Sequence, residues 1–211
     1  MRILNRTLIG YITLAAGISA SVQMILLVLM FTVSRNLFGT ISDYFYALTP
    51  LLILPLIIVL PKFLVRHNLG ISQVFRFIGV IGILIASLAQ VILLLKIIDL
   101  KQSIWGNLVG LGIIGIPILV MSLINLGNPD LPAAFNWFGI VFGIAMVIGI
   151  PAGFFFLDEL YAVQNGTLVW SATSPLIYPV IFAGFITQIG LPVWLIWTAR
   201  LLLSSTLKIL N

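Results

Sequence analysis

The chain has 211 residues, of which 62% are hydrophobic and only 7% are charged. About a quarter of the residues of a typical soluble domain are charged, so a soluble globule, a disordered chain and a coiled coil are all excluded. What remains is a multi-pass membrane protein, which we expect to form a single integral membrane domain over residues 1–211.

Six apolar runs are long enough to cross a bilayer. A membrane-spanning helix needs about 20 mainly apolar residues to cross about 30 Å of hydrocarbon. Charged or turn-rich segments separate the runs and are predicted to be loops, among them residues 34–40 and 62–76. The longest predicted loop covers residues 158–174. The predicted spans are residues 7–33, 44–60, 77–95, 104–126, 133–157 and 175–203.

The fold class is therefore all-α, a polytopic bundle of six transmembrane helices. Its orientation follows from the basic residues, because cytoplasmic loops carry an excess of Lys and Arg. Seven basic residues fall on the side of the termini and three on the other side, which predicts that both termini are cytoplasmic. The seven are Arg2, Arg6, Lys62, Arg66, Arg76, Arg200 and Lys208, and the three are Arg35, Lys96 and Lys101. This placement accounts for the net charge of +5 without a nucleic-acid partner, and we expect none.

The acidic residues are predicted to lie outside the membrane interior. All five fall at the ends of the predicted spans or in loops, and they are Asp43, Asp99, Asp130, Asp158 and Glu159. Proton-coupled carriers use ionisable groups inside the bilayer, where the high cost of burying a charge marks such groups as functional. The sequence thus disfavours a proton-driven transporter.

Neutral polar residues do occur within the spans. Gln90, Asn107, Asn136 and Gln188 are the candidates for function, and Gln90 and Gln188 lie well inside their spans. One interpretation is that they form hydrogen bonds between helices. The alternative is that they line a polar path through the bundle.

Glycines recur at the spacing that lets helices approach closely. The candidate helix-packing residues form three Gly-xxx-Gly pairs, which are Gly106 and Gly110, Gly139 and Gly143, and Gly149 and Gly153. Because glycine has no side chain, such a face allows close contact between backbones. The contact can be made with another helix of this chain or with a partner protein, and the sequence leaves both open.

Prolines and aromatic residues add less specific signals. Prolines such as Pro50, Pro55 and Pro61 in the second span predict kinks. Tyr46 and Trp194 lie near span ends, where aromatic side chains typically anchor helices at the membrane surface. Trp194 and Trp197 also share a helical face on which a planar pigment or lipid could stack.

No catalytic site, metal site or cofactor site is predicted. The chain has no cysteine, and its single histidine, His67, has no acidic residue within helical reach. A membrane enzyme would need titratable groups clustered near one membrane surface. Only Asp158 and Glu159, with Tyr161 nearby, come close to this, and we therefore expect a protein that is not an enzyme.

Three segments carry a resemblance. The first is Leu-Pro-Ala-Ala-Phe-Asn-Trp-Phe-Gly-Ile-Val-Phe-Gly at residues 131–143, and the second is the closing Leu-Pro-Val-Trp-Leu-Ile-Trp at residues 191–197, followed by Arg200. The third is Phe-Arg-Phe at residues 75–77. They resemble an uncharacterised family of small multi-spanning bacterial proteins, known only as a domain of unknown function. The resemblance extends from about the second span onward. It implies six helices and a bacterial inner membrane, and it carries no activity.

Two functions fit these features. The first is a non-enzymatic accessory or structural subunit that acts through helix packing in a larger membrane complex, with the lipid bilayer and other membrane subunits as its partners. The alternative is a carrier of a small solute, lipid or other hydrophobic molecule, with a neutral polar path between kinked helices. A cavity lined by the polar residues would favour the carrier, whereas close-packed contacts would disfavour it.

Overall fold

The protein folds as a bundle of α-helices in a computed structural model that describes residues 3–64, 69–167 and 174–204. The described residues form seven helices, which are α1 (Ile3–Thr32), α2 (Arg35–Leu64), α3 (Leu69–Leu94), α4 (Leu100–Ile124), α5 (Ala133–Phe155), α6 (Leu157–Asn165) and α7 (Ile177–Leu203). Six of them, all except α6, are long and apolar enough to span a membrane. The predicted all-α fold with six spanning helices is confirmed.

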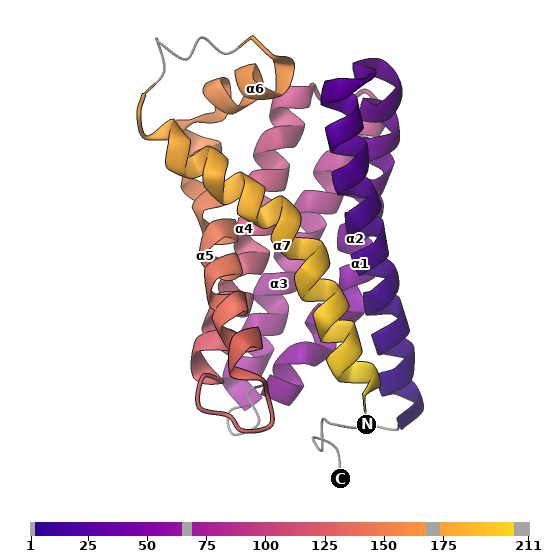
Figure 1. Ribbon diagram of the computed structural model, residues 1–211, viewed down its shortest axis with the longest axis vertical. Coiled ribbons are helices and arrows are strands. Elements are labelled where there is room, and N and C mark those ends of the chain that lie inside the picture. Colours follow the sequence, from indigo (N-terminus) through magenta and orange to yellow (C-terminus); the bar gives the residue numbers. More distant parts are fainter. Residues whose placement is uncertain (1–2, 65–68, 168–173, 205–211) are drawn as a thin grey trace.

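The six long helices form a closed ring. In chain order α1, α2, α3, α4 and α5 each pack against the next, and α7 then packs against both α5 and α1. Figure 1 shows α7 crossing the bundle at an angle, with its end beside the start of α1. The Nε of Arg6 on α1 donates a 2.6 Å hydrogen bond to the carbonyl of Leu202 on α7, which places the first and last spans at the same end of the bundle.

The core runs through all six long helices. Its fully buried members include Ile57 on α2, Ile83 on α3, Ile118 on α4, Phe142 on α5 and Leu195 on α7. Large apolar side chains also cover the outside of the bundle, where a soluble protein would carry charges. This pattern is what a helical protein surrounded by lipid requires.

The long helices extend beyond the predicted spans. Residues 34–40, predicted to be a loop, are almost entirely helical, since α2 begins at Arg35, and the predicted loop at residues 62–76 shortens in the same way, because α3 begins at Leu69. The physical reason is that the length of a helix and the length of the apolar segment that crosses the hydrocarbon need not be equal. A helix can continue past the hydrocarbon into the headgroup region, where long basic side chains reach water.

The predicted loop at residues 158–174 is wrong in its first half, which forms α6. This helix covers the end of the bundle opposite the chain termini (Figure 1) and contacts α4 and α5. It ends at Gly166, whose φ of 68° lies in the left-handed region that glycine adopts readily. Within the segment predicted to be a loop, Gly166 thus terminates a helix.

Candidate functional site

A cavity of about 630 Å³ lies in the half of the bundle that carries α6. All seven helices contribute to its walls, and α6 covers one end through Leu160, Val163 and Gln164. Most of the lining is apolar. The polar members are Asp43, Tyr46, Gln90, Ser103, Asn107, Gln164, Thr187 and Gln188.

The course of α7 creates this space. In its second half α7 packs closely on its neighbours, since a Cβ built on Gly17 of α1 would lie 3.2 Å from the backbone nitrogen of Ile196, and one built on Gly190 would lie 2.6 Å from the ring of Phe142. In its first half Ala183 is still buried, but open space adjoins Gly184. Gly184 lines the cavity, and a Cβ built on it would meet no atom within 4 Å.

The cavity opens sideways between α1 and α7. The lining residues Val28 and Phe31 on α1 are each 56% exposed, and on α7 Phe185 is 62% and Ile189 56% exposed. These apolar side chains rim an opening that would face lipid rather than water when the bundle spans a membrane. A molecule dissolved in the bilayer could therefore reach the cavity without crossing an aqueous phase.

Hydrogen bonds join three helices at the deep end of the cavity. The side-chain amide nitrogen of Gln188 on α7 donates to the hydroxyl of Tyr46 on α2 over 2.5 Å. The amide nitrogen of Gln23 on α1 donates to the Oε1 of Gln188 over 3.3 Å. Tyr46 was predicted to belong to an aromatic belt at the membrane surface, and the structure places it inside the bundle instead, because its hydroxyl finds a partner there.

Asp43 is the charged residue among those that the structure describes in the cavity wall. We had predicted it at the edge of a span, whereas it lies inside α2 and inside the apolar span Leu37–Pro61. Its position six residues after Leu37 corresponds to about 9 Å along the helix axis. The side chain is half-buried, and its carboxylate forms neither an ion pair nor a hydrogen bond with any residue in the described part of the chain.

Gln90 and Asn107 line the cavity from α3 and α4. The hydroxyl of Ser103 donates to the Oε1 of Gln90 over 3.1 Å, so that Gln90 both joins two helices and faces the cavity. The Oδ1 of Asn107 is buried and has no hydrogen-bond partner within the described ranges. An unpaired buried oxygen is costly, so Asn107 offers an unused hydrogen-bonding group to a ligand.

The structure brings three of the four predicted polar residues together. Gln90, Asn107 and Gln188 share the cavity, but Asn136 does not line it. Asn136 is 1% exposed, and its Nδ2 donates a 2.6 Å hydrogen bond to the carbonyl of Asn125 at the end of α4. It therefore lies in a close-packed contact near the opposite end of the bundle.

The six predicted packing glycines all face neighbouring helices of this chain. On α4, Gly106 and Gly110 face α3 at Ala89 and Ala86, respectively. On α5, the four glycines face α4, and they are Gly139 and Gly143, opposite Ser122 and Leu119, and Gly149 and Gly153, opposite Leu108 and Val109. The central helix α4 is thus in backbone-close contact on two sides.

An aromatic cluster fills the interface of α5 and α7. Trp194 stacks on Phe135 with ring centres 6.3 Å apart, and Trp197 meets the same ring edge-on at 5.5 Å. Trp194 is 2% exposed, so its predicted place in the membrane-surface belt is wrong. Because phenylalanines of α5 contact both tryptophans, these rings are engaged within the chain.

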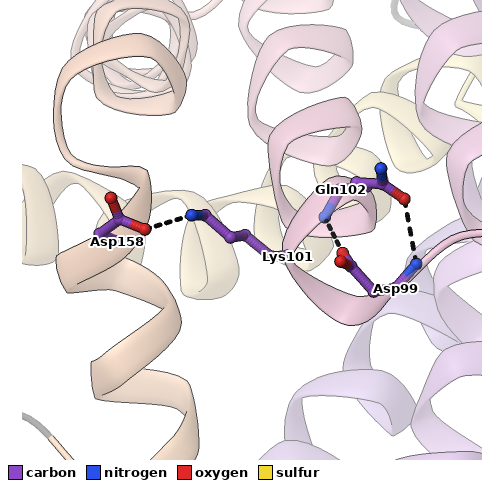
Figure 2. A network of polar contacts seen from close by, with 4 residues as sticks. All are labelled: Asp99, Lys101, Gln102 and Asp158. Atoms are coloured by element: carbon purple, nitrogen blue, oxygen red, sulfur yellow. Dashed lines mark hydrogen bonds and ion pairs between the residues drawn. The ribbon is translucent and has the colours of Figure 1, made fainter.

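Polar contacts tie the α6 end to α4, as Figure 2 shows. Lys101 in the first turn of α4 pairs with Asp158 of α6. Asp99 caps α4, since its Oδ1 accepts from the backbone nitrogen of Gln102 over 2.7 Å, while the Gln102 side chain accepts from the backbone nitrogen of Asp99 over 3.1 Å. Asp158 and Glu159, considered above as a titratable cluster, lie in the first turn of α6.

Within the described ranges no three His, Cys, Asp or Glu side chains are grouped so as to hold a metal ion. His67 lies outside the described residues. Sequence reasoning missed Asp43 and Gly184 as cavity residues. For Asp43 a signal existed, because a carboxylate three residues before Tyr46 shares a helical face with it.

Comparisons with known proteins found no match, whether against protein-family models, curated proteins or solved structures. The resemblance noted above for residues 131–143 and 191–197 accordingly stays a prediction.

Proposed function

We propose that this chain is an integral membrane protein that binds a small hydrophobic or amphipathic molecule in the cavity and exchanges it with the bilayer. The observation that carries this proposal is the apolar cavity with its opening between α1 and α7. Its volume of about 630 Å³ falls within the range of about 300–1,000 Å³ that is typical of small-molecule sites. Such sites are mostly apolar with a few polar groups, as this one is.

The proposal corresponds to the carrier that the sequence suggested as an alternative. The accessory-subunit hypothesis drew on small-residue faces that a partner could contact, and those glycines are turned toward helices of the same chain. The accessory-subunit hypothesis therefore stays a prediction, and these glycines do not support it. Proteins that co-purify stoichiometrically from native membranes would restore it.

We also propose that the cavity lies in the outer half of a bacterial inner membrane, with the termini in the cytoplasm. The support is the excess of Lys and Arg in segments at the terminal end of the bundle. We expect no catalytic activity, because the described residues of the cavity wall include one carboxylate and no other acidic, basic or histidine side chain.

Filling the cavity tests the proposal. The purified protein in lipid nanodiscs is titrated with N-phenyl-1-naphthylamine, a neutral dye that fluoresces in apolar sites, and empty nanodiscs provide the background. Gly184→Trp places an indole in the open space beside Gly184 and should abolish the saturable signal. Phe182→Trp is the matched control, since Phe182 lies on the same helix, is 67% exposed and does not line the cavity.

If Gly184→Trp leaves the saturable binding of the dye unchanged, the proposal is contradicted. A signal no larger than that of empty nanodiscs would also contradict it. If the proposal holds, native mass spectrometry of the protein extracted from its own membranes should also detect a retained lipid or hydrophobic molecule. The Gly184→Trp protein should lack it.

A further inference from the structure

We propose that the molecule bound in the cavity is a lipophilic cation, with its positive group beside Asp43 and its apolar part directed toward the opening between α1 and α7. This inference rests on the proposed function and adds to it the charge and the orientation of the ligand. Three features of the cavity carry it, namely the sign of its charge, the absence of a partner for that charge, and the position of the apolar rim.

Among the described residues of the cavity wall there is a single formal charge, which is negative. Asp43 lines the cavity, whereas no Lys, Arg or His side chain is among the described lining residues. An anionic ligand would meet an uncompensated carboxylate in surroundings of low dielectric constant, where repulsion is stronger than in water. A cationic ligand would be attracted by the same field.

The carboxylate has no counter-charge within the described part of the protein. The ion pair found there joins Lys101 and Asp158 near the bundle end, and Asp43 forms no ion pair with any described residue. Charged side chains inside membrane spans are costly and usually pair with one another, line a water-filled path or meet a ligand. A ligand cation supplies the partner that the described part of the chain lacks.

The cavity wall combines a charged residue with an exposed apolar rim. Asp43 and Tyr46 lie three residues apart on α2, one turn of helix, and Tyr46 is held by Gln188 from across the bundle. The rim at Phe31 and Phe185 is apolar and exposed. A cationic group at Asp43 can therefore be bound while a hydrocarbon or aromatic part of the ligand extends to the rim.

Two ions of almost the same shape and opposite charge test the inference. Tetraphenylphosphonium and tetraphenylborate are titrated against the full chain in nanodiscs of neutral lipid, by equilibrium dialysis with empty nanodiscs subtracted. We expect the cation to bind at least about tenfold more tightly than the anion, the size of effect that one charge-assisted contact provides. Asp43→Asn should remove this preference.

The matched control is Asp130→Asn, which makes the same change of charge in an exposed residue of the α4–α5 connection, at the end of the bundle far from the cavity. It should leave the preference intact. Binding of the neutral naphthylamine dye by Asp43→Asn reports that the variant is folded and that its cavity is formed.

The two proposals fail in different ways. The lipophilic-cation inference is overturned if cation and anion bind equally, or if the preference for the cation survives Asp43→Asn. In either case, dye binding that is lost in Gly184→Trp still supports the cavity as a hydrophobic site. Loss of all saturable binding, dye included, overturns both. If Asp43→Asn fails to fold, Asp43→Glu and Asp43→Ala take its place. Asp43→Glu should retain the preference for the cation over the anion, and Asp43→Ala should lose it.

Discussion

The side chain of Gln188 on α7 donates a hydrogen bond to the hydroxyl of Tyr46 on α2, across a cavity that separates most of the two helices. The two residues are 142 positions apart in the chain. Tyr46 belongs to the second span and Gln188 to the last, so this bond fixes the deep end of the cavity only when the ring of helices has closed.

We predict that Gln188→Leu and Tyr46→Phe destabilise the protein in a coupled manner. Hydrogen bonds between membrane helices contribute on average about 0.6 kcal/mol and at most about 2 kcal/mol. Each single variant should lower the melting temperature in detergent, and the double variant should cost less than the sum of the two. Strictly additive losses would show that the bond contributes nothing.

Gly110→Ala should be strongly destabilising. A Cβ at this position would lie 2.6 Å from the backbone nitrogen of Ala86 and 2.8 Å from the carbonyl oxygen of Gly82, and neither atom can move without displacing α3. Forcing an extra methyl group into packed helices costs about 1–3 kcal/mol. The measurement is thermal unfolding in detergent.

The control for that experiment is Gly184→Ala, which adds the same methyl group to a helix at a position where it meets no atom within 4 Å. It should be neutral or slightly stabilising, because alanine favours helix more than glycine does. Equal losses for the two variants would refute the packing argument.

The two polar contacts shown in Figure 2 should differ in strength. Asp99→Ala removes the cap of α4 and should cost about 0.5–2 kcal/mol. Asp158→Ala removes an ion pair whose side chains are 40% and 81% exposed, and exposed pairs contribute at most about 1 kcal/mol. Unfolding measured at low and high salt should show that the stability lost in Asp158→Ala depends on the salt concentration. A larger loss of stability in Asp158→Ala than in Asp99→Ala would contradict the expected order.

The orientation can be measured directly, because the chain contains no cysteine. Thr167→Cys follows α6 and Gly127→Cys lies in the α4–α5 connection at the opposite end of the bundle. With cytoplasmic termini, a membrane-impermeant maleimide should label Thr167→Cys in intact cells and Gly127→Cys only after the membrane is opened. The reverse pattern would invert the topology.

The number and nature of the spans were predictable from the sequence, because apolar length is a local property. The ends of the helices were less predictable from the sequence. Residues 34–40 look polar and carry Gly39, yet α2 begins at Arg35, since the end of a helix is set by backbone hydrogen bonds and not by the edge of the hydrocarbon. The helix α6 was missed because nine residues with two acids read as a loop.

The site was predictable in part. Gln90, Asn107 and Gln188 were identified because an uncharged polar residue in a span needs a partner or a function, and all three line the cavity. Asn136 satisfies the same criterion but bonds to a backbone carbonyl. The choice between these outcomes depends on which way each helix is rotated and tilted, and helix tilt is a property of the assembled bundle.

The closed ring has a consequence for how the protein is made. Gln23 is synthesised 165 residues before Gln188, the side chain to which it donates, and the wall that α7 supplies is the last to be inserted. Until then α1 and α5 lack the helix that joins them. The cavity thus comes into existence only when α7 has been inserted, with α7 packed closely along its second half and with room for a bound molecule beside Gly184 in its first half.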